Sequence, residues 1–283
     1  MRLFVDVYHY FAFSDGGEGG NPAGVSFWDV FPKNSEMCQL AAELGYSESV
    51  FARPEQGGFR VRYFSPESEI PFCGHATLAL GAALCEHYGG GQFELTLNDA
   101  KISVCGEQTK DGIRVSLKSP PTQNSIISDT TYRTALDVFG YTDAQINTTI
   151  PPARIYAGAD HLVLSLKSRS DLARMRYDME ACRTFMIENN FVTVMLVWQE
   201  SDRLFCVRNA FASSGIFEDP ATGAAAAAFA GYLRDKGLSS EKNLVFLQGQ
   251  DMGMPSRLLT HAGSDVGGAI TVSGMVRPLS ISG

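Results

Sequence analysis

The sequence lacks several features that mark whole classes of proteins. It has no cluster of lysine and arginine, and its 31 acidic residues against 23 basic ones give a net charge of −8. A negative field repels nucleic-acid phosphates and anionic lipid headgroups. No stretch reaches the roughly 18 consecutive apolar residues that a membrane-spanning helix needs. We therefore expect a cytoplasmic protein that binds neither nucleic acid nor membranes.

Metal-binding and disulfide patterns are also missing. The histidines and acidic residues show no HExxH spacing, and the cysteines form no CxxC pair, so neither a zinc site nor a disulfide framework is indicated. The glycine-rich residues 15–20 do not follow the strand–loop–helix pattern of a nucleotide-binding loop. We expect reduced thiols, no metal and no cofactor. The six cysteines are Cys38, Cys73, Cys85, Cys105, Cys182 and Cys206.

Many short β-strands and a few helices are what the sequence does contain. Asp6 and His9 interrupt the apolar residues 1–13, which favours a strand from residue 3 over a signal peptide. Further short runs rich in Val, Ile, Phe and Tyr lie between turn residues. The last two strands are expected at 269–273 and 275–281.

Two helices, 76–88 and 222–233, are apolar on nearly every side. A helix without a polar face is enclosed by protein all round, and alanine and glycine let strands approach it closely. Each half of the chain holds one such helix among many strands. The pattern therefore predicts an α+β fold of two similar domains that join near residues 119–123, each with mostly antiparallel strands around a central helix.

The segments before these two helices carry candidate chemistry. Residues 69–75 (EIPFCGH) precede the first and residues 218–223 (EDPATG) precede the second. The unpaired N–H groups and positive dipole end of a helix N-terminus bind carboxylate or phosphate. If the two halves face each other, both helix ends meet at one cleft between the domains. The alternative is that Asp219 and Thr222 are ordinary helix caps.

Two further residues have open interpretations. Glu48, in the segment GYSESVF, is either a surface carboxylate or a general base in an apolar cleft, and the local pattern does not decide between them. Asn21 precedes a proline in a glycine-rich segment, where a turn is favoured over a contact with substrate.

Six segments, read in order, resemble the PhzF family, which is named for a phenazine-biosynthesis isomerase and is similar in fold to diaminopimelate epimerase. They are residues 20–25 (GNPAGV), 47–51 (SESVF), 62–66 (RYFSP), Glu69, 73–77 (CGHAT) and 218–225 (EDPATGAA). The resemblance covers essentially the whole chain. It implies a diaminopimelate epimerase-like fold in which the last strand, 271–283, returns to an N-terminal domain of residues 1–118, with 119–270 forming the C-terminal domain.

The resemblance also implies a function. It is that of a cofactor-independent isomerase, usually a homodimer, in which a glutamate moves a proton on a small carboxylated amine or hydroxy acid. Carried over by motif, the catalytic residues are Glu48, His75 and Asp219, and backbone groups at Gly74, Gly223 and Ala224 bind the substrate carboxylate. The phenazine enzyme has serine where this chain has Ala224, so the identity of the substrate stays open.

Two alternatives to this function remain. Epimerases of the same fold use two facing thiols, but only Cys73 stands at such a position, and the second helix start has no cysteine. A buried cysteine near a helix start is more often a small hydrophobe, which is the interpretation we favour for Cys73. The other alternative is a non-catalytic protein on this fold that binds a small acid or a protein partner.

Overall fold

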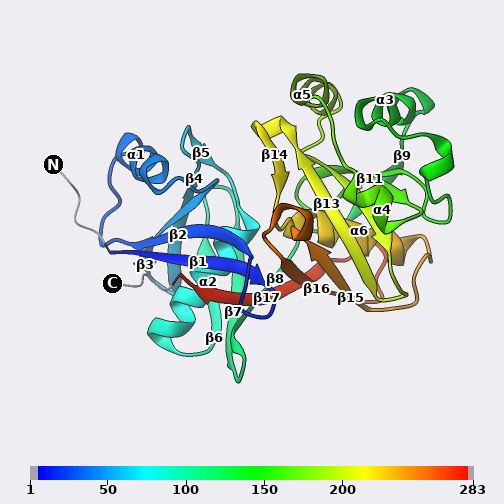
Figure 1. Ribbon diagram of the computed structural model, residues 1–283. Coiled ribbons are helices and arrows are strands. Elements are labelled where there is room, and N and C mark those ends of the chain that lie inside the picture. The colour runs from blue at the N-terminus through cyan, green and yellow to red at the C-terminus, as the bar shows by residue number, and fades with distance from the viewer. Residues whose placement is uncertain (1–5, 280–283) are drawn as a thin grey trace. The chain divides into compact units, whose positions relative to one another are not determined.

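The computed structural model describes residues 6–279. Contacts within the chain separate two units. The first unit comprises the described parts of 1–118 and 273–283, and the second comprises 119–272. The last strand, β17 (Ile270–Pro278), begins in the second unit and ends in the first (Figure 1, red). The strands predicted from residue 3 and up to residue 281 extend partly outside the described residues.

The first unit is a ring of strands around one helix. Its strands pair in the order β1–β2–β3–β4–β6–β7–β8–β17, and β17 pairs with β1 again, which closes a barrel. The pairs β2–β3 and β4–β6 are parallel. The elements are β1 (Val7–Ser14), β2 (Asn21–Phe27), α1 (Asn34–Leu44), β3 (Ser49–Glu55), β4 (Gly58–Phe64), β5 (Glu69–Ile70), α2 (Gly74–Tyr88), β6 (Gly91–Thr96), β7 (Lys101–Thr109) and β8 (Gly112–Lys118).

The second unit repeats this order of pairing. Parallel pairs β11–β12 and β13–β15 correspond to β2–β3 and β4–β6, and the short strand β14 pairs with β13 as β5 pairs with β4. The elements are β9 (Gln123–Ile126), α3 (Asp129–Phe139), β10 (Ala153–Tyr156), β11 (Asp160–Leu166), α4 (Arg169–Ala173), α5 (Met179–Glu188), β12 (Thr193–Gln199), β13 (Leu204–Phe211), β14 (Ile216–Asp219), α6 (Gly223–Asp235), β15 (Asn243–Gln248) and β16 (Ser256–Ala262). The two units are thus pseudo-symmetric, as the sequence predicts.

The two apolar helices are the central elements. Residues 75–85 of α2 are all buried, as are residues 225–233 of α6. Glycine permits the closest contacts. A Cβ on Gly81 would lie 2.6 Å from a Val115 methyl carbon, and one on Gly231 would lie 2.6 Å from the Thr122 side chain. The small residues therefore set how tightly strands and loops surround each helix.

Three local predictions are wrong. Asn21 and Pro22 begin β2 rather than a turn, and the turn lies earlier, where Asp15 and Glu18 form a β-bridge around Gly16 and Gly17. The two strands expected near the C-terminus are one, because the chain stays extended through Gly274. The sequence pattern also misses the short strands β5, β9 and β14, together with β8 and α4.

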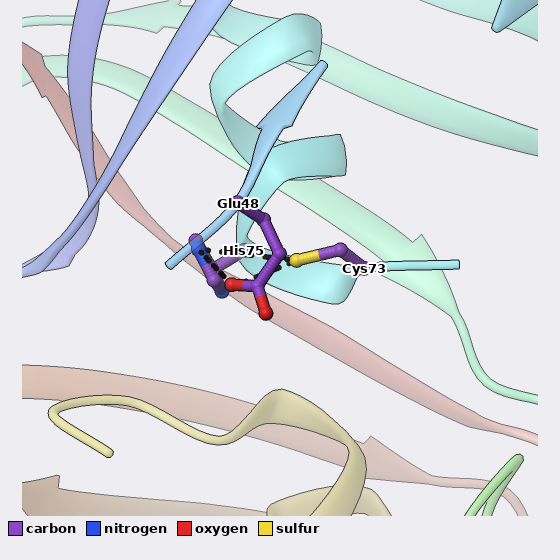
Figure 2. Close-up of side chains that lie close together, drawn as sticks. All are labelled: Glu48, Cys73 and His75. Atoms are coloured by element: carbon purple, nitrogen blue, oxygen red, sulfur yellow. Dashed lines mark hydrogen bonds and ion pairs between the residues drawn. The ribbon is translucent and has the colours of Figure 1, made fainter. Parts of the chain in front are cut away.

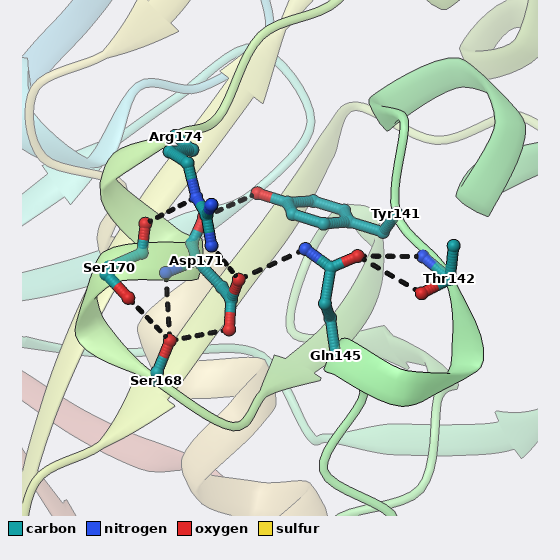
Figure 3. Close-up of polar contacts among 7 residues, drawn as sticks. All are labelled: Tyr141, Thr142, Gln145, Ser168, Ser170, Asp171 and Arg174. Carbon is teal, nitrogen blue, oxygen red and sulfur yellow. Dashed lines mark hydrogen bonds and ion pairs between the residues drawn. The ribbon is translucent and has the colours of Figure 1, made fainter.

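The short helix α4 shows why such elements escape the pattern. Its Asp171 is held by the flanking residues Ser168 and Arg174 and by Tyr141 and Gln145 from an earlier segment (Figure 3). Asp171 accepts hydrogen bonds from Ser168, Gln145 and Arg174, and its backbone carbonyl accepts one from the Tyr141 hydroxyl at 2.9 Å. A helix this short is unstable alone, so contacts distant in sequence decide that it forms.

Helix lengths in the described chain bear on the membrane question. The longest helix within residues 6–279, α2, has 15 residues, and none of the described helices combines the length and apolar character required to cross a membrane.

Candidate active site

Three side chains that can carry or transfer a proton meet at the N-terminus of α2 (Figure 2). The Glu48 carboxylate lies 3.4 Å from Nε2 of His75, and Sγ of Cys73 lies 3.3 Å from Nδ1 of the same ring. His75 and Cys73 are buried, and the Glu48 side chain is only 15% exposed. This burial contradicts the interpretation of Glu48 as a surface residue.

The fold positions Glu48 through the strand that follows it. Glu48 is the last residue before β3, which runs parallel to β2 with Ser49 opposite Gly24. A Cβ on Gly24 would lie 2.7 Å from Leu44 and 3.2 Å from Oγ of Ser49. Glycine at this position of the GNPAGV segment therefore lets the loop that carries Glu48 lie directly against β2.

The strand β2 also holds His75. Its ring donates a hydrogen bond to the backbone carbonyl of Pro22. Burial lowers the pKa of His75 below its ordinary value, while the nearby Glu48 carboxylate and the Pro22 carbonyl oppose this shift in part. The lowered pKa favours the neutral form of the imidazole beside Glu48.

The N-terminus of α2 begins at a residue that does not cap it with its side chain. Cys73 is the N-cap residue and makes no side-chain cap hydrogen bond. The first helical residue, Gly74, leaves space, since the atom nearest to an added Cβ would be 4.0 Å away, on Phe72. That the first N–H groups of this helix bind an anion stays a prediction.

In the second unit, Asp219 belongs to a hydrogen-bonded group at the start of α6. Its Oδ2 accepts a hydrogen bond of 2.5 Å from the Thr222 hydroxyl. Gln248 donates to the Asp219 carbonyl at 2.6 Å and to the Thr222 hydroxyl, and its Oε1 accepts from the Thr222 N–H. Thr222 is the N-cap residue of α6, but its side chain makes no cap hydrogen bond. The interpretation of Thr222 as an ordinary side-chain cap is therefore wrong.

A buried polar chain lies beside Asp219 on the sheet. Asn209 of β13 is the register partner of Asp219, so both side chains project from the same face of the sheet. The Thr193 hydroxyl donates to Oδ1 of Asn209, and Nδ1 of His161 lies 2.7 Å from the same hydroxyl. Nδ2 of Asn209 and Nε2 of His161 are buried without a hydrogen-bond partner. The sequence does not predict this hydrogen-bonded row of residues or the contact with Gln248, because strand pairing brings these residues together.

A bidentate Arg–Glu ion pair precedes the start of each central helix. Glu69 lies five residues before the first residue of α2, and Glu218 lies five residues before the first residue of α6. Arg62 donates to both oxygens of Glu69 at 2.8 and 2.5 Å, and Arg208 donates to both oxygens of Glu218 at 3.0 and 2.5 Å. These motif glutamates are thus structural anchors.

The predicted site residues fall into two groups. Glu48, Gly74 and His75 lie together in the first unit. Asp219, Gly223 and Ala224 lie together in the second, at the start of α6. The expectation that both groups act on one substrate stays a prediction.

The first group also includes possible metal ligands. Glu48, Cys73 and His75 offer one ligand atom each, and these atoms lie within 4.8 Å of one another. The sequence does not reveal this group as a short motif, because the strands β3, β4 and β5 separate Glu48 from Cys73 and His75 along the chain.

Comparison with known proteins identifies the family of this chain. The sequence profile described as phenazine biosynthesis-like protein, PhzC-PhzF, matches residues 10–276. The chain is 31% identical over 262 residues to a trans-2,3-dihydro-3-hydroxyanthranilate isomerase of Pseudomonas aeruginosa, covering 86% of this chain and 85% of that protein. It is 28% identical over 278 residues to an uncharacterized isomerase of Bacillus subtilis, covering 95% and 94%.

A solved structure shares the fold. The phenazine biosynthesis protein of the PhzF family from Bacillus anthracis superimposes with a TM-score of 0.86 at 21% identity, covering 98% of this chain and 97% of that one. The predicted α+β fold class and the resemblance of the motifs are both confirmed. The chain belongs to the PhzC-PhzF family of phenazine biosynthesis-like proteins.

Proposed function

We propose that this protein is a cofactor-independent isomerase that moves a proton on a small amino or hydroxy acid, with Glu48 as the acid–base group. The observation that carries the proposal is the position of the Glu48 carboxylate, 3.4 Å from the His75 ring and next to the uncapped N-terminus of α2. The isomerase names of its relatives support the reaction type.

The proposed mechanism uses one residue for both halves of the proton transfer. Glu48 removes a proton from a carbon atom of the substrate and returns it to another face or another carbon. Negative charge develops on the substrate as the proton leaves, and the N–H groups of Gly74 and His75 at the helix N-terminus stabilise it. The His75 ring lies beside the Glu48 carboxylate, with its Nε2 atom 3.4 Å away. General acid–base catalysis of this kind contributes about 10²–10⁴-fold in rate.

We assign binding roles to the group in the second unit. Asp219 is a carboxylate that pairs with a substrate amino group, and the N–H groups of Gly223 and Ala224 at the start of α6 bind a substrate carboxylate. The hydrogen bonds from Thr222 and Gln248 support this role because they fix the backbone and side chain of Asp219 before any ligand arrives.

The first compound to test follows from a relative. The Pseudomonas aeruginosa protein is named as an isomerase of trans-2,3-dihydro-3-hydroxyanthranilate, a molecule with a carboxylate, an amine and a hydroxyl group. Ala224 lacks the hydroxyl of the serine found in the phenazine enzyme, so we propose that a different small acid is the better substrate. A panel of amino and hydroxy acids, screened by thermal shift, identifies compounds that bind.

The test of the mechanism is the exchange of substrate protons with solvent. With a compound that binds, we expect the wild-type protein to incorporate deuterium from D2O at the reacting carbon, as followed by NMR. Glu48→Gln keeps the shape and the hydrogen-bonding capacity of the side chain but removes the base. It should lower the exchange rate by about 10²–10⁴-fold while ligand affinity stays within a few-fold.

A matched control separates loss of the base from loss of charge. Glu43→Gln makes the same change at an exposed position of α1, five residues before Glu48, and should leave exchange unchanged. Exchange that persists in Glu48→Gln would refute the role of Glu48. Binding without exchange in the wild type would favour the alternative of a non-catalytic protein that binds small acids.

A further inference from the structure

The group of Glu48, Cys73 and His75 has the donor chemistry of a metal site as well as that of an acid–base site. Thiolate sulfur, imidazole nitrogen and carboxylate oxygen are the three ligand types that zinc accepts in proteins. Sites with three protein ligands leave a fourth position for water. The three side chains come from two segments that the fold brings together, the start of β3 and the start of α2 (Figure 2).

The distances are close to those of a tetrahedral zinc site. With zinc bonds of about 2.3 Å to sulfur and 2.0–2.2 Å to nitrogen and oxygen, neighbouring ligand atoms are about 3.4–3.6 Å apart. In this protein Nε2 of His75 lies 3.4 Å from Oε2 of Glu48 and 3.8 Å from Sγ of Cys73, while Nδ1 lies 3.3 Å from the same sulfur. All three ligand atoms lie within 4.8 Å of one another. Small side-chain rotations therefore suffice to place an ion among them.

Surrounding contacts orient two of the ligands. The His75 ring donates one N–H to the Pro22 carbonyl, which leaves its other nitrogen as an acceptor. Zinc-bound histidines commonly make such a bond to a backbone carbonyl. The Cys73 carbonyl accepts a hydrogen bond of 2.6 Å from the Thr77 hydroxyl, which in turn bonds to Tyr63. Cys73 also stands at the N-terminus of α2, where the helix dipole favours the negative charge of a thiolate.

We propose that Glu48, Cys73 and His75 bind a zinc ion, and that bound zinc inhibits the isomerase by occupying the carboxylate of its base. The inhibitory part rests on the proposed function, whereas the binding part does not. On binding, the Cys73 thiol releases its proton to solvent and bonds form from the ion to sulfur, nitrogen and oxygen. No atom changes oxidation state, and water takes the fourth position.

Cobalt(II) is the spectroscopic probe for the binding part, because a thiolate bonded to it gives a charge-transfer absorption band in the near ultraviolet. We expect one equivalent of Co2+ to give this band with the reduced, full-length protein, and one equivalent of Zn2+ to abolish it by displacement. Cys73→Ser, which preserves the size of the side chain, should remove the band, and His75→Ala should weaken Co2+ binding at least tenfold.

The control variant is Cys105→Ser, since Cys105 is an exposed cysteine on β7, in the same unit. It should keep the band unchanged. A band that survives in Cys73→Ser, or that is lost in Cys105→Ser, would overturn the assigned site, as would the absence of any band in the wild type. Circular dichroism of each variant verifies that it is folded.

Inhibition is measured separately by proton exchange. With a compound that exchanges, Zn2+ at 100 times its dissociation constant should slow exchange about 100-fold by simple occupancy, and a chelator should restore it. Exchange that continues at full zinc occupancy would overturn inhibition. A cobalt band in a protein that exchanges no compound would instead support the metal site and count against the proposed isomerase.

Discussion

The starts of α2 and α6 are built on one plan and differ in what they present. Both helices begin five residues after a glutamate held by both oxygens to an arginine, and both have an N-cap residue without a side-chain cap hydrogen bond. At α2, Glu48, Cys73 and His75 meet. At α6, Asp219 is tied to Thr222 and Gln248.

This difference favours different roles for the groups at α2 and α6. The group at α2 contains side chains that can gain and lose a proton, and its glutamate lies beside a histidine whose neutral form is favoured by burial. The group at α6 is fixed by hydrogen bonds to an amide and a hydroxyl, which suits binding. The repeated scaffold thus has a helix start without a side-chain cap in both units, and the one at α2 carries the proposed base.

The largest expected effect concerns the two arginine anchors. Arg208 and Glu218 are 8% and 3% exposed, whereas Arg62 and Glu69 are 16% and 21% exposed. Removing Arg208 leaves a buried, uncompensated carboxylate, so Arg208→Ala should lower the free energy of unfolding by about 3–5 kcal/mol. Arg62→Ala should cost only about 1 kcal/mol, because water reaches its partner. Urea unfolding followed by fluorescence measures both.

A double variant checks the cause. Arg208→Met combined with Glu218→Leu removes both charges and should regain most of the lost stability, because no buried charge is left unpaired. If the double variant is no more stable than Arg208→Ala, the loss comes from packing, and the two anchors do not differ in the way their burial indicates.

A smaller effect is expected where each central helix is most tightly enclosed. An added methyl group at Gly81 of α2 or at Gly231 of α6 meets side-chain atoms at 2.6 Å. Gly81→Ala and Gly231→Ala should each lower the unfolding free energy by about 1–3 kcal/mol, despite the better helix propensity of alanine. Gly74→Ala, with 4.0 Å of space, is the matched control and should be nearly neutral. Equal stability of all three variants would contradict the tight packing.

The two buried histidines should make stability fall in acid. Burial lowers the pKa of His161 from 6.5 to about 3. The folded state then binds fewer protons than the unfolded state below pH 6.5, so stability should fall by about 1.4 kcal/mol per pH unit from pH 6.5 towards pH 3. Burial also lowers the pKa of His75, which acts in the same direction, while the Glu48 carboxylate opposes the shift in part.

Urea unfolding at several pH values tests this decline. His161→Gln should flatten the decline of stability with falling pH, and His75→Gln should also flatten it. The comparison is between slopes, so a variant that is uniformly less stable remains informative. An unchanged slope in His161→Gln would show that the histidine does not stay neutral in the folded state.

The smallest change tests the binding role at α6. Asp219→Asn keeps an acceptor for the Thr222 hydroxyl and should alter the unfolding free energy by less than about 1 kcal/mol. If Asp219 pairs with a substrate amine, the variant should lose about tenfold or more in affinity for amino acids and little for the matching hydroxy acids. Isothermal titration of both ligand classes decides, and equal losses would refute the amine contact.

Much of this architecture follows from the sequence. The apolar character of residues 76–88 and 222–233 on every side requires enclosure, and both helices are indeed buried. The residues Glu48, His75 and Asp219 are recognisable because they lie in segments that resemble motifs of the PhzF family. Short strands such as β5 and β14, with two and four residues, are not recognisable, since pairing with a neighbour and not local preference stabilises them.

Periodicity and motif order, which are local properties of the chain, thus determine the two enclosed helices, the repeated plan and the identity of the candidate residues. The tertiary structure alone decides which of those residues meet. The thiol of Cys73 joins Glu48 and His75, and Asn209 and Gln248 join Asp219, only because strand pairing places distant segments side by side. Burial, which sets the charge of His75 and of His161, is likewise a property of the folded chain, because desolvation depends on everything packed around a group.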